Sequence, residues 1–499
     1  MIGGASAMAV TAAVGLCYAI YKAVKWIHSL RQNYKTFERI GVAGPKPIFL
    51  LGNALEFMKK PKKMHEVHAD LIKKYGRVTG LFMGVRGRYL LTDPDIIKEI
   101  TVKQFSNFLN RSITFNTGFR FDLGLLILRD DHWKKVRNIL TPNFTSNKMK
   151  NMRPLLDDST RILMQKLDEA TKTGEPVNIW EWFGTYTMQI IMATAFGTDV
   201  DSQTNSDNIL NKRASQSLHL SPFAVISAVF LPALFPLMVR LDRSFINGMG
   251  FIDNFADKVL SMRKKEVDSK RQDIMQIMID ASDESKKGSL THDEAVGQII
   301  TVLLAGYETT NNALGYIAYL LALHPEVQDK LINEIESAYN STDSKEIDYD
   351  IIMYKMAYLD MVISESLRLY PPVMSIGREI KEDCVIKGVK FLKGLTIGIP
   401  AYAMHRDPEF WEEPEKFDPE RFSEERKNSI NTYAYLPFGI GPRACIGSRF
   451  ALMEIKLCLV KVLMAYRFVT CPETQIPLQV KSAGSLSPQN GIYLKIEKR

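Results

Sequence analysis

Cysteine is scarce and scattered in this chain of 499 residues. The five cysteines, Cys17, Cys384, Cys445, Cys458 and Cys471, are odd in number and widely spaced, which makes a poor framework for disulfides. No C-x-x-C pair occurs, so a structural zinc site is not expected. Reduced thiols in a domain that faces the cytosol are the natural interpretation.

Dense basic runs and internal repeats are absent as well. The formal charge of +8 and the isoelectric point near 8.9 are mildly basic, which is compatible with nucleic acid, an anionic membrane or an acidic protein as partner. Because lysine and arginine are spread over the whole chain, we expect no nucleic-acid partner. A hydrophobic content of 46% excludes wholesale disorder and allows a sizeable core.

Charge is missing from the first 21 residues, MIGGASAMAVTAAVGLCYAIY. About 20 apolar residues suffice to cross a bilayer, and a cleaved signal peptide would carry positive charge before its apolar core. Basic residues follow the apolar stretch, which predicts a cytoplasmic downstream side. We therefore expect a membrane anchor at 1–28, a basic and proline-rich linker at 29–47 and one catalytic domain at 48–499.

A second apolar stretch, residues 218–239, reads LHLSPFAVISAVFLPALFPLMV and is interrupted by three prolines. It is either a buried core segment or a surface segment that dips into lipid, and the pattern favours the second. Helical periodicity dominates from about 150 to 370, and short strands are expected near 78–92 and 380–400. The sequence predicts a mainly α fold with a minor β-sheet portion.

One expected helix is unusually long. Thr291 and Glu294 form a T-x-x-E capping box, and apolar character continues to Leu323. A helix of about 32 residues is roughly 48 Å long, enough to cross the whole domain.

The middle of this helix combines Ala305, Gly306, Glu308 and Thr309. Thr309 could simply bond back to the carbonyl of Ala305 and bend the helix. The coincidence of small residues, a hydroxyl and an acid in an apolar helix instead favours room for a ligand beside groups that move protons.

A charged pair, Glu365 and Arg368, shares one helical face within an apolar segment. A buried structural pair is the favoured interpretation, and Arg421 in DPERF is expected to join it.

The stretch FGIGPRACIG begins at Phe438 and leads into an apolar helix pattern. Its glycines are Gly439, Gly441 and Gly447. Glycine permits sharp turns and close approach to a flat group, and a helix N-terminus lowers the pKa of a thiol such as that of Cys445. Arg443 can reach an acidic substituent on the same group. Haem satisfies all of these demands.

These motifs resemble those of the cytochromes P-450. The resemblance covers essentially the whole globular part through FGIGPRACIG, AGYETT, ESLR, DPERF and the WKKVR that starts at Trp133. AYAMHRDPEFWEEPEKFDPERF and CPETQIPLQV are similar to the animal family 3 of these microsomal enzymes. The implied fold is a helical prism with a minor sheet portion, preceded by a single transmembrane helix.

The resemblance implies roles for individual residues. Cys445 would bind iron, and Thr309 and Glu308 would deliver protons to bound dioxygen. The implied haem contacts are Arg111, Trp133, Arg137, Ala305, Gly306, Arg378, Phe438, Gly439, Arg443 and Gly447. The implied substrate contacts are Phe115, Leu126, Leu304, Val373 and Ile376.

The implied activity is monooxygenation of small apolar substrates such as steroids, fatty acids or xenobiotics. It would use haem b, dioxygen and NADPH through a flavoprotein reductase, with cytochrome b5 and membrane lipid as further partners. The expected location is the endoplasmic reticulum membrane, with the catalytic domain facing the cytosol. A reductase-independent isomerase or dehydratase and a non-enzymatic haem binder are the alternatives. The intact Glu308–Thr309 pair speaks against the isomerase.

Overall fold

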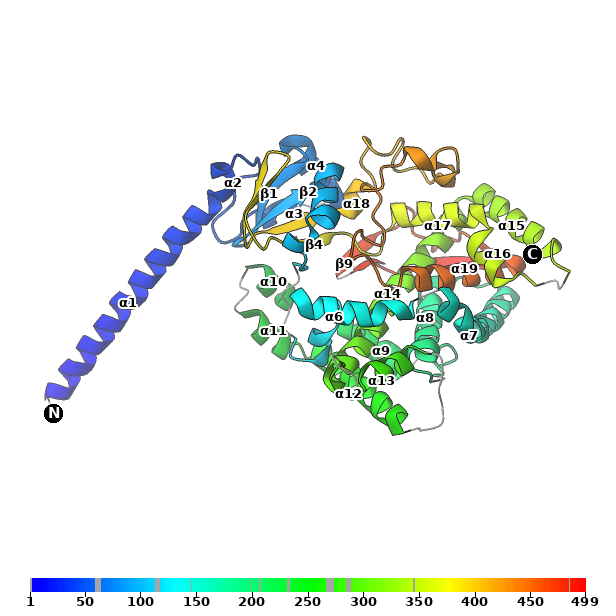
Figure 1. The fold of residues 1–499 in the computed structure, drawn as a ribbon, viewed down its shortest axis with the longest axis horizontal. Helices are drawn as coiled ribbons and strands as arrows, with labels where there is room; N and C mark the ends of the chain where they lie inside the picture. The colour runs from blue at the N-terminus through cyan, green and yellow to red at the C-terminus, as the bar shows by residue number, and fades with distance from the viewer. Residues whose placement is uncertain are drawn as a thin grey trace.

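The computed structural model describes most of the chain. The described residues are 2–58, 64–112, 117–144, 146–198, 200–205, 208–230, 234–265, 273–283, 289–343, 346–483 and 485–499. Helices dominate and strands are short, which confirms the mainly helical fold (Figure 1).

The first helix, α1 (Ile2–Tyr34), extends away from the body of the molecule, and α2 (Thr36–Arg39) follows it (Figure 1). Val14, Leu16 and Val24 on α1 are more than half exposed. Across the described residues, no helix is both long and apolar enough to cross a membrane. The side chains of the first twelve residues, where the expected anchor begins, lie outside the described part of the chain.

The largest sheet lies beside the N-terminal segment (Figure 1). In spatial order its strands are β1 (Val78–Met83), β2 (Arg86–Leu91), β7 (Thr396–Ile399) and β4 (Ile376–Glu379). Within this sheet β2 and β7 pair in parallel, and the other two pairs are antiparallel. In the β4–β7 pair Arg378 lies opposite Ile397. The strands expected near 78–92 and 380–400 are confirmed.

The other described strands form smaller groups. β5 (Cys384–Ile386) pairs with β6 (Val389–Phe391), β9 (Val480–Ala483) pairs with β10 (Ser485–Pro488), and β11 (Tyr493–Lys498) lies between β3 (Val177–Asn178) and β8 (Tyr466–Val469).

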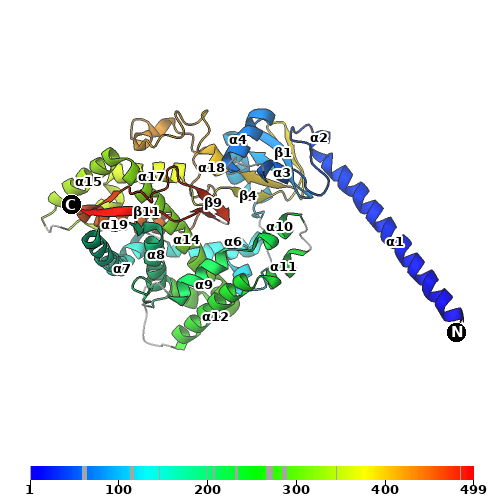
Figure 2. The same cartoon turned by 180° about the vertical axis from the view of Figure 1, so that it is seen from behind.

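Helices form the rest of the body (Figure 2). They are α3 (Ala54–Met58), α4 (Met64–Tyr75), α5 (Pro94–Lys98), α6 (Asp130–Leu140), α7 (Ser146–Thr173), α8 (Ile179–Ala195), α9 (Ile209–Leu218), α10 (Pro222–Phe230), α11 (Phe235–Leu241), α12 (Arg243–Lys265), α13 (Ile274–Ala281), α14 (His292–Leu323), α15 (Pro325–Asn340), α16 (Tyr349–Tyr354), α17 (Ala357–Leu369), α18 (Ala401–Met404) and α19 (Ser448–Ala465). Single turns are η1 (Glu99–Lys103), η2 (Phe105–Asn107), η3 (Arg120–Leu123), η4 (Thr141–Asn143), η6 (Pro419–Phe422) and η7 (Lys427–Ser429).

Helix α14 runs through the middle of the body, as both views show (Figures 1 and 2). Its N-terminus carries the expected capping box: Thr291 accepts from the N–H of Glu294, and the Glu294 carboxylate accepts from the N–H of Thr291. The predicted extent of this helix is therefore confirmed.

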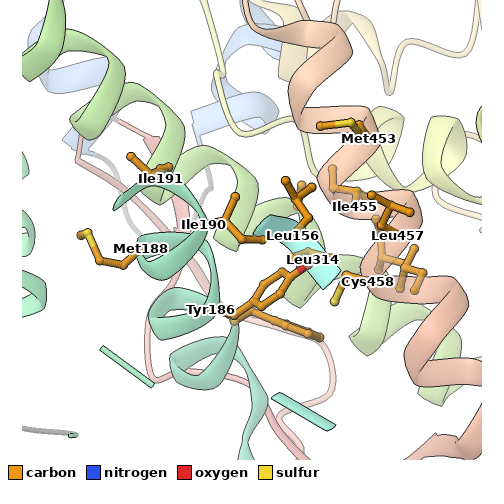
Figure 3. Packing of buried hydrophobic residues seen from close by; sticks show 14 of the residues in the cluster. Leu156, Tyr186, Met188, Ile190, Ile191, Leu314, Met453, Ile455, Leu457 and Cys458 are labelled. Carbon is orange, nitrogen blue, oxygen red and sulfur yellow. The ribbon is translucent and has the colours of Figure 1, made fainter. Parts of the chain in front are cut away.

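The main core forms where α7, α8, α14 and α19 meet (Figure 3). Leu156, Ile190, Leu314 and Leu457 come from these four helices and are buried together. Packing on several sides explains why α14 is apolar around most of its circumference.

The apolar segment 218–239 forms α10 and α11, while residues 231–233 lie outside the described part of the chain. Phe223 and Leu237 point outward, with exposed fractions of 76% and 50%. The segment therefore presents apolar side chains at the surface instead of burying them all in the core.

Candidate active site

The loop before α19 bends sharply around Cys445. Gly439 and Gly441 have φ angles of +71° and +75°, which glycine adopts without strain. A Cβ on Gly441 would lie 2.1 Å from the carbonyl oxygen of Thr101, so the loop packs backbone against backbone on η1. The N–H of Cys445 donates to the carbonyl of Phe438 at 2.9 Å and closes the turn.

The free thiol of Cys445 does not have the lowered pKa expected from a helix N-terminus. The residue precedes the first residue of α19, Ser448, by three positions, and desolvation raises its pKa. The N–H of Gly447 and the charges of Arg111 and Arg137 act in the opposite direction without prevailing. Binding to a metal cation would deprotonate the thiol outright.

Guanidinium groups gather around this loop. Burial, together with repulsion from Arg111, lowers the pKa of Arg378 to about 9 and that of Arg443 to about 8. The Nε atoms of Arg111 and Arg378 are buried and lack a hydrogen-bond partner. Because buried like charges are costly unless an anion joins them, the cluster fits a ligand with carboxylates.

Arg443 itself is held firmly. It donates to the carbonyls of Leu109, Leu125 and Leu128 at 3.0, 3.4 and 2.8 Å. Its guanidinium carbon lies 4.0 Å from the centre of the Trp133 ring on α6, a cation–π distance. The arginine thereby joins the cysteine loop to α6 and to the loop before it.

Helix α14 has a locally open surface. Ala305 is exposed and Thr309 is half-buried, although most neighbouring residues of the helix are buried. The hydroxyl of Thr309 donates to the carbonyl of Ala305 at 2.6 Å, as the helix-bending interpretation requires. A Cβ on Gly306 would lie 2.9 Å from Cδ1 of Ile191, so this glycine lets α14 approach α8 closely.

Glu308 is buried beside Thr309. Desolvation raises its pKa, against the hydrogen bond with Ser485 and the charges of His219 and Lys481. The side chain of Asn312 donates to the Ser485 hydroxyl at 3.0 Å. A carboxyl group in such a setting can hold a proton at a higher pH than an exposed glutamate does. The link to Ser485 and Asn312 was not expected from the sequence, where these residues lie far apart.

The structure brings Glu365, Arg368 and Arg421 together. Two parallel hydrogen bonds of 2.7 Å join Arg368 to Glu365, and neither side chain has exposed surface. Arg421 donates to the same carboxylate at 3.3 Å. Arg368 also donates to the carbonyls of His405 and Pro414, each at 2.7 Å.

His405 extends this network to the cysteine loop and was missed by the sequence reasoning. Its Nδ1 lies 3.2 Å from the carbonyl oxygen of Arg368, and its Nε2 accepts from the N–H of Leu436 at 2.8 Å. Burial lowers the pKa of His405 to about 3, so the ring is neutral. A lone histidine directly after the apolar AYAM segment was the available signal.

The residues expected to contact substrate have mixed settings. Leu126 is half-buried, and Val373 is 44% exposed. Cδ1 of Ile376 lies 3.8 Å from the position of a Cβ on Gly439, beside the cysteine loop. Leu304 is buried in the main core. Phe115 lies outside the described residues.

A cavity of about 650 Å³ borders Cys445. It is lined by Arg137, Asn138, Thr141, Pro142, Phe144, Cys445, Ile446, Ser448 and Arg449. A Cβ on Gly447 would have no other atom within 4 Å. The thiol can bind iron, the open glycine admits a flat ring, and the unpartnered arginine Nε atoms can bind propionates. The fold and this site define a haem-thiolate protein.

Comparison with known proteins leads to the same class of protein. The family model described as cytochrome P450 matches residues 42–496. The chain is 39% identical over 471 residues to cytochrome P450 3A9 of Rattus norvegicus, which covers 93% of this chain and 92% of the rat protein. It is 39% identical over 472 residues to cytochrome P450 3A6 of Oryctolagus cuniculus, covering 93% of each chain. Cytochrome P450 3A17 of Cavia porcellus is 40% identical over 472 residues, covering 93% of this chain and 92% of the relative.

The chain therefore belongs to the cytochrome P450 family, and the resemblance to animal family 3 is confirmed. It is a haem-thiolate monooxygenase of apolar substrates that uses haem b, dioxygen and electrons from NADPH through a reductase. These relatives do not favour the isomerase or the non-enzymatic haem binder.

Proposed function

We propose that the cysteine loop holds the haem of this monooxygenase. The thiolate of Cys445 binds the iron, and haem supplies the activation of dioxygen when it is bound. Phe438, Gly439 and Gly447 border the ring from the loop. The residues that bind the propionates are Arg111, Trp133, Arg137, Arg378 and Arg443. The unpartnered Nε atoms of Arg111 and Arg378 support this assignment most directly.

Glu308 and Thr309 of α14 deliver protons in this proposal. The raised pKa of Glu308 lets its carboxyl group hold a proton, and the hydroxyl of Thr309 lies on the open surface next to it. Rotation of that hydroxyl away from the carbonyl of Ala305 would present its proton to the open side. Ala305 and Gly306 carry little or no side chain beside this path.

The substrates are steroids, fatty acids or xenobiotics of mainly apolar surface. The observation that carries this proposal is the open surface of α14 at Ala305 and Thr309. Leu126, Val373 and Ile376 would add apolar side chains to the substrate site. Such a site recognises shape and apolar area more than individual polar groups.

The chain works at the endoplasmic reticulum membrane with the domain 48–499 in the cytosol. Residues 1–28 would form the single-pass anchor and 29–47 the linker, and the exposed apolar side chains of α1 support this placement. Lys134 and Arg449 are exposed near the cysteine loop. Acidic surfaces of a flavoprotein reductase and of cytochrome b5 would dock against them.

The test is a substrate screen with the full-length chain, the reductase, NADPH and lipid. Steroids, fatty acids and xenobiotics are titrated for substrate-induced shifts of haem absorption, and products are identified. We expect hydroxylated products that require NADPH and reductase and are lost in Cys445→Ser. Products formed from an organic hydroperoxide alone, with none from NADPH and reductase, would contradict the proposal.

A further inference from the structure

One side of α14 is covered by another segment of the chain near the start of the helix and is exposed further along it. Gly297, Thr301, Ala305 and Thr309 follow one another at intervals of four residues and therefore lie along one side of the helix. A Cβ on Gly297 would lie 2.4 Å from the carbonyl oxygen of Arg120. This side of the helix emerges from under this cover at Ala305, which is exposed.

The covering chain is the loop 120–128. A Cβ on Gly124 would lie 1.8 Å from the hydroxyl oxygen of Thr301, so the loop touches this side of the helix one turn before Ala305. Leu126 comes two residues after this contact. The loop therefore forms the wall at the end of the open surface.

Gln298 holds this wall in place. Its side-chain oxygen accepts from the N–H of Leu125 at 2.8 Å, and its side-chain nitrogen donates to the carbonyl of Leu123 at 2.6 Å. The same nitrogen donates to the carbonyl of Glu294 at 3.0 Å. Only 1% of the residue is exposed. The amide is thus hydrogen-bonded to the backbone on both sides of Gly124.

Arg443 of the cysteine loop also binds the loop 120–128, because it donates to the carbonyls of Leu125 and Leu128. Movement of the loop is thereby restrained both by α14 and by the cysteine loop. If the hydrogen bonds of Gln298 to the loop were lost, those of Arg443 would remain. The loop 120–128 could then shift without loss of the haem site.

We propose that Gln298 is a positioning residue that sets the space available to a ligand beside Ala305 and Thr309. Gln298 does not touch the ligand. It fixes the position of the loop 120–128 and thereby that of Leu126. The inference deepens the proposed function, because it assumes that Leu126 faces the substrate.

A purely structural role is the competing explanation, and the chain offers a matched control. Gln328 is also buried, and its amide also pairs with a backbone segment. Its nitrogen donates to the carbonyl of Phe468 at 3.0 Å, and its oxygen accepts from the N–H of Phe468 at 2.9 Å. The same nitrogen donates to the carbonyl of Leu321 at 3.2 Å, near the C-terminal end of α14, as that of Gln298 donates to Glu294 near its start. The pair with Phe468 joins α15 to β8, two elements that supply none of the assigned site residues.

The experiment compares Gln298→Met and Gln328→Met with the parent protein. Methionine keeps the length of the side chain but removes all three hydrogen bonds of each amide. Hydrogen exchange is followed in peptides that cover 119–128 and 466–469. Binding of imidazole and of a bulky triaryl-substituted imidazole is titrated by haem absorption, because their affinity ratio reports the space beside the iron without turnover.

We expect Gln298→Met to raise exchange at Leu125 by about tenfold and to change the azole affinity ratio by at least about threefold, because the loop 120–128 loses its two hydrogen bonds to Gln298. Gln328→Met should raise exchange only in the second peptide and keep the parental ratio. Gln298→Glu, which keeps the acceptor for Leu125, should lie between Gln298→Met and the parent.

An unchanged ratio in Gln298→Met, or the same change in both methionine variants, would overturn the inference. Failure of the parent to oxidise any substrate with NADPH and reductase would instead count against the proposed function, since azole binding needs no turnover.

Discussion

Burial has opposite consequences for different ionisable residues near the cysteine loop. It lowers the pKa of Arg378 and Arg443, which makes their positive charges costly and favours an anionic ligand. Cys445 is exposed at the surface, yet desolvation by the surrounding protein still raises the pKa of its thiol, which makes the thiolate dependent on a cation. A group that carries both iron and carboxylates would stabilise the thiolate and neutralise the buried arginine charges.

Replacement of Cys445 tests this dependence. Cys445→Ser should abolish the thiolate-type spectrum of the ferrous carbon monoxide complex, because serine does not supply a thiolate. Cys458 is fully buried in α19 beside Tyr186, and burial raises the pKa of its thiol. Cys458→Ala should therefore keep the spectrum and lose only packing. A thiolate spectrum in Cys445→Ser would remove the assignment of the iron ligand.

Thr309→Ala separates proton delivery from helix bending. Haem incorporation should be unchanged, whereas hydrogen peroxide released per NADPH should rise and product should fall by about tenfold or more, within the range for a lost general acid. An unchanged ratio of product to NADPH would leave Thr309 with the bond to Ala305 as its only role.

Glu454 offers a test through pH. It is buried on α19, its Oε1 has no hydrogen-bond partner, and burial raises its pKa well above the usual 4.5. The folded state therefore holds the proton more tightly than the unfolded state. The stabilisation is complete below the usual pKa and is lost as pH rises toward the raised one.

Glu454→Gln should remove this loss. The free energy of unfolding should match that of the parent near pH 5 and exceed it near pH 8 by about 1–3 kcal/mol, at most about 1.36 kcal/mol per pH unit. Denaturant unfolding at both values measures it. Glu424→Gln, at a carboxylate that is 87% exposed, is the control and should show no such gain. A pH-independent difference for Glu454→Gln would contradict the argument.

At the scale of helices and strands, periodicity and caps predicted much of what the structure contains. The bounds of α14 followed from its capping box, and the strands near 78–92 and 380–400 from alternation. The pairing partners of buried side chains did not follow, because they join distant segments. Glu365 with Arg421 could be suggested from motifs, but His405 with Leu436 and Gln298 with Leu125 depend on tertiary packing.

The buried network on α17 gives a prediction at this scale. Arg368→Lys should lower the free energy of unfolding by about 3–5 kcal/mol, because lysine cannot make the paired hydrogen bonds to Glu365 and leaves buried groups unsatisfied. Thermal unfolding and the yield of haem protein measure the loss. The exposed pair of Lys150 and Asp350 is the control, and Lys150→Met should cost less than about 1 kcal/mol. Equal losses in both variants would show that burial of the network does not matter.

At the scale of the whole molecule, the residues that the structure describes include two exposed apolar surfaces. One is α1, which extends away from the body (Figure 1). The other is the outer side of α10 and α11, where Phe223, Ile226, Leu237 and Leu241 are all at least half exposed. Exposed apolar area of this kind is typical of surfaces that meet a membrane or another protein.

Removal of residues 1–28 should leave a folded haem protein that still binds partly to phospholipid vesicles. Burial of each large apolar side chain of α10 and α11 in lipid would contribute about 1.5–3 kcal/mol, so the remaining surface is sufficient for measurable binding. In the truncated chain, Phe223→Ser combined with Ile226→Ser should shift the protein to the supernatant of a vesicle sedimentation assay. Met262→Ser, at an exposed apolar residue of α12, should leave binding unchanged. A truncated chain that stays in the supernatant without detergent or added salt would assign the membrane contact to the N-terminal helix alone.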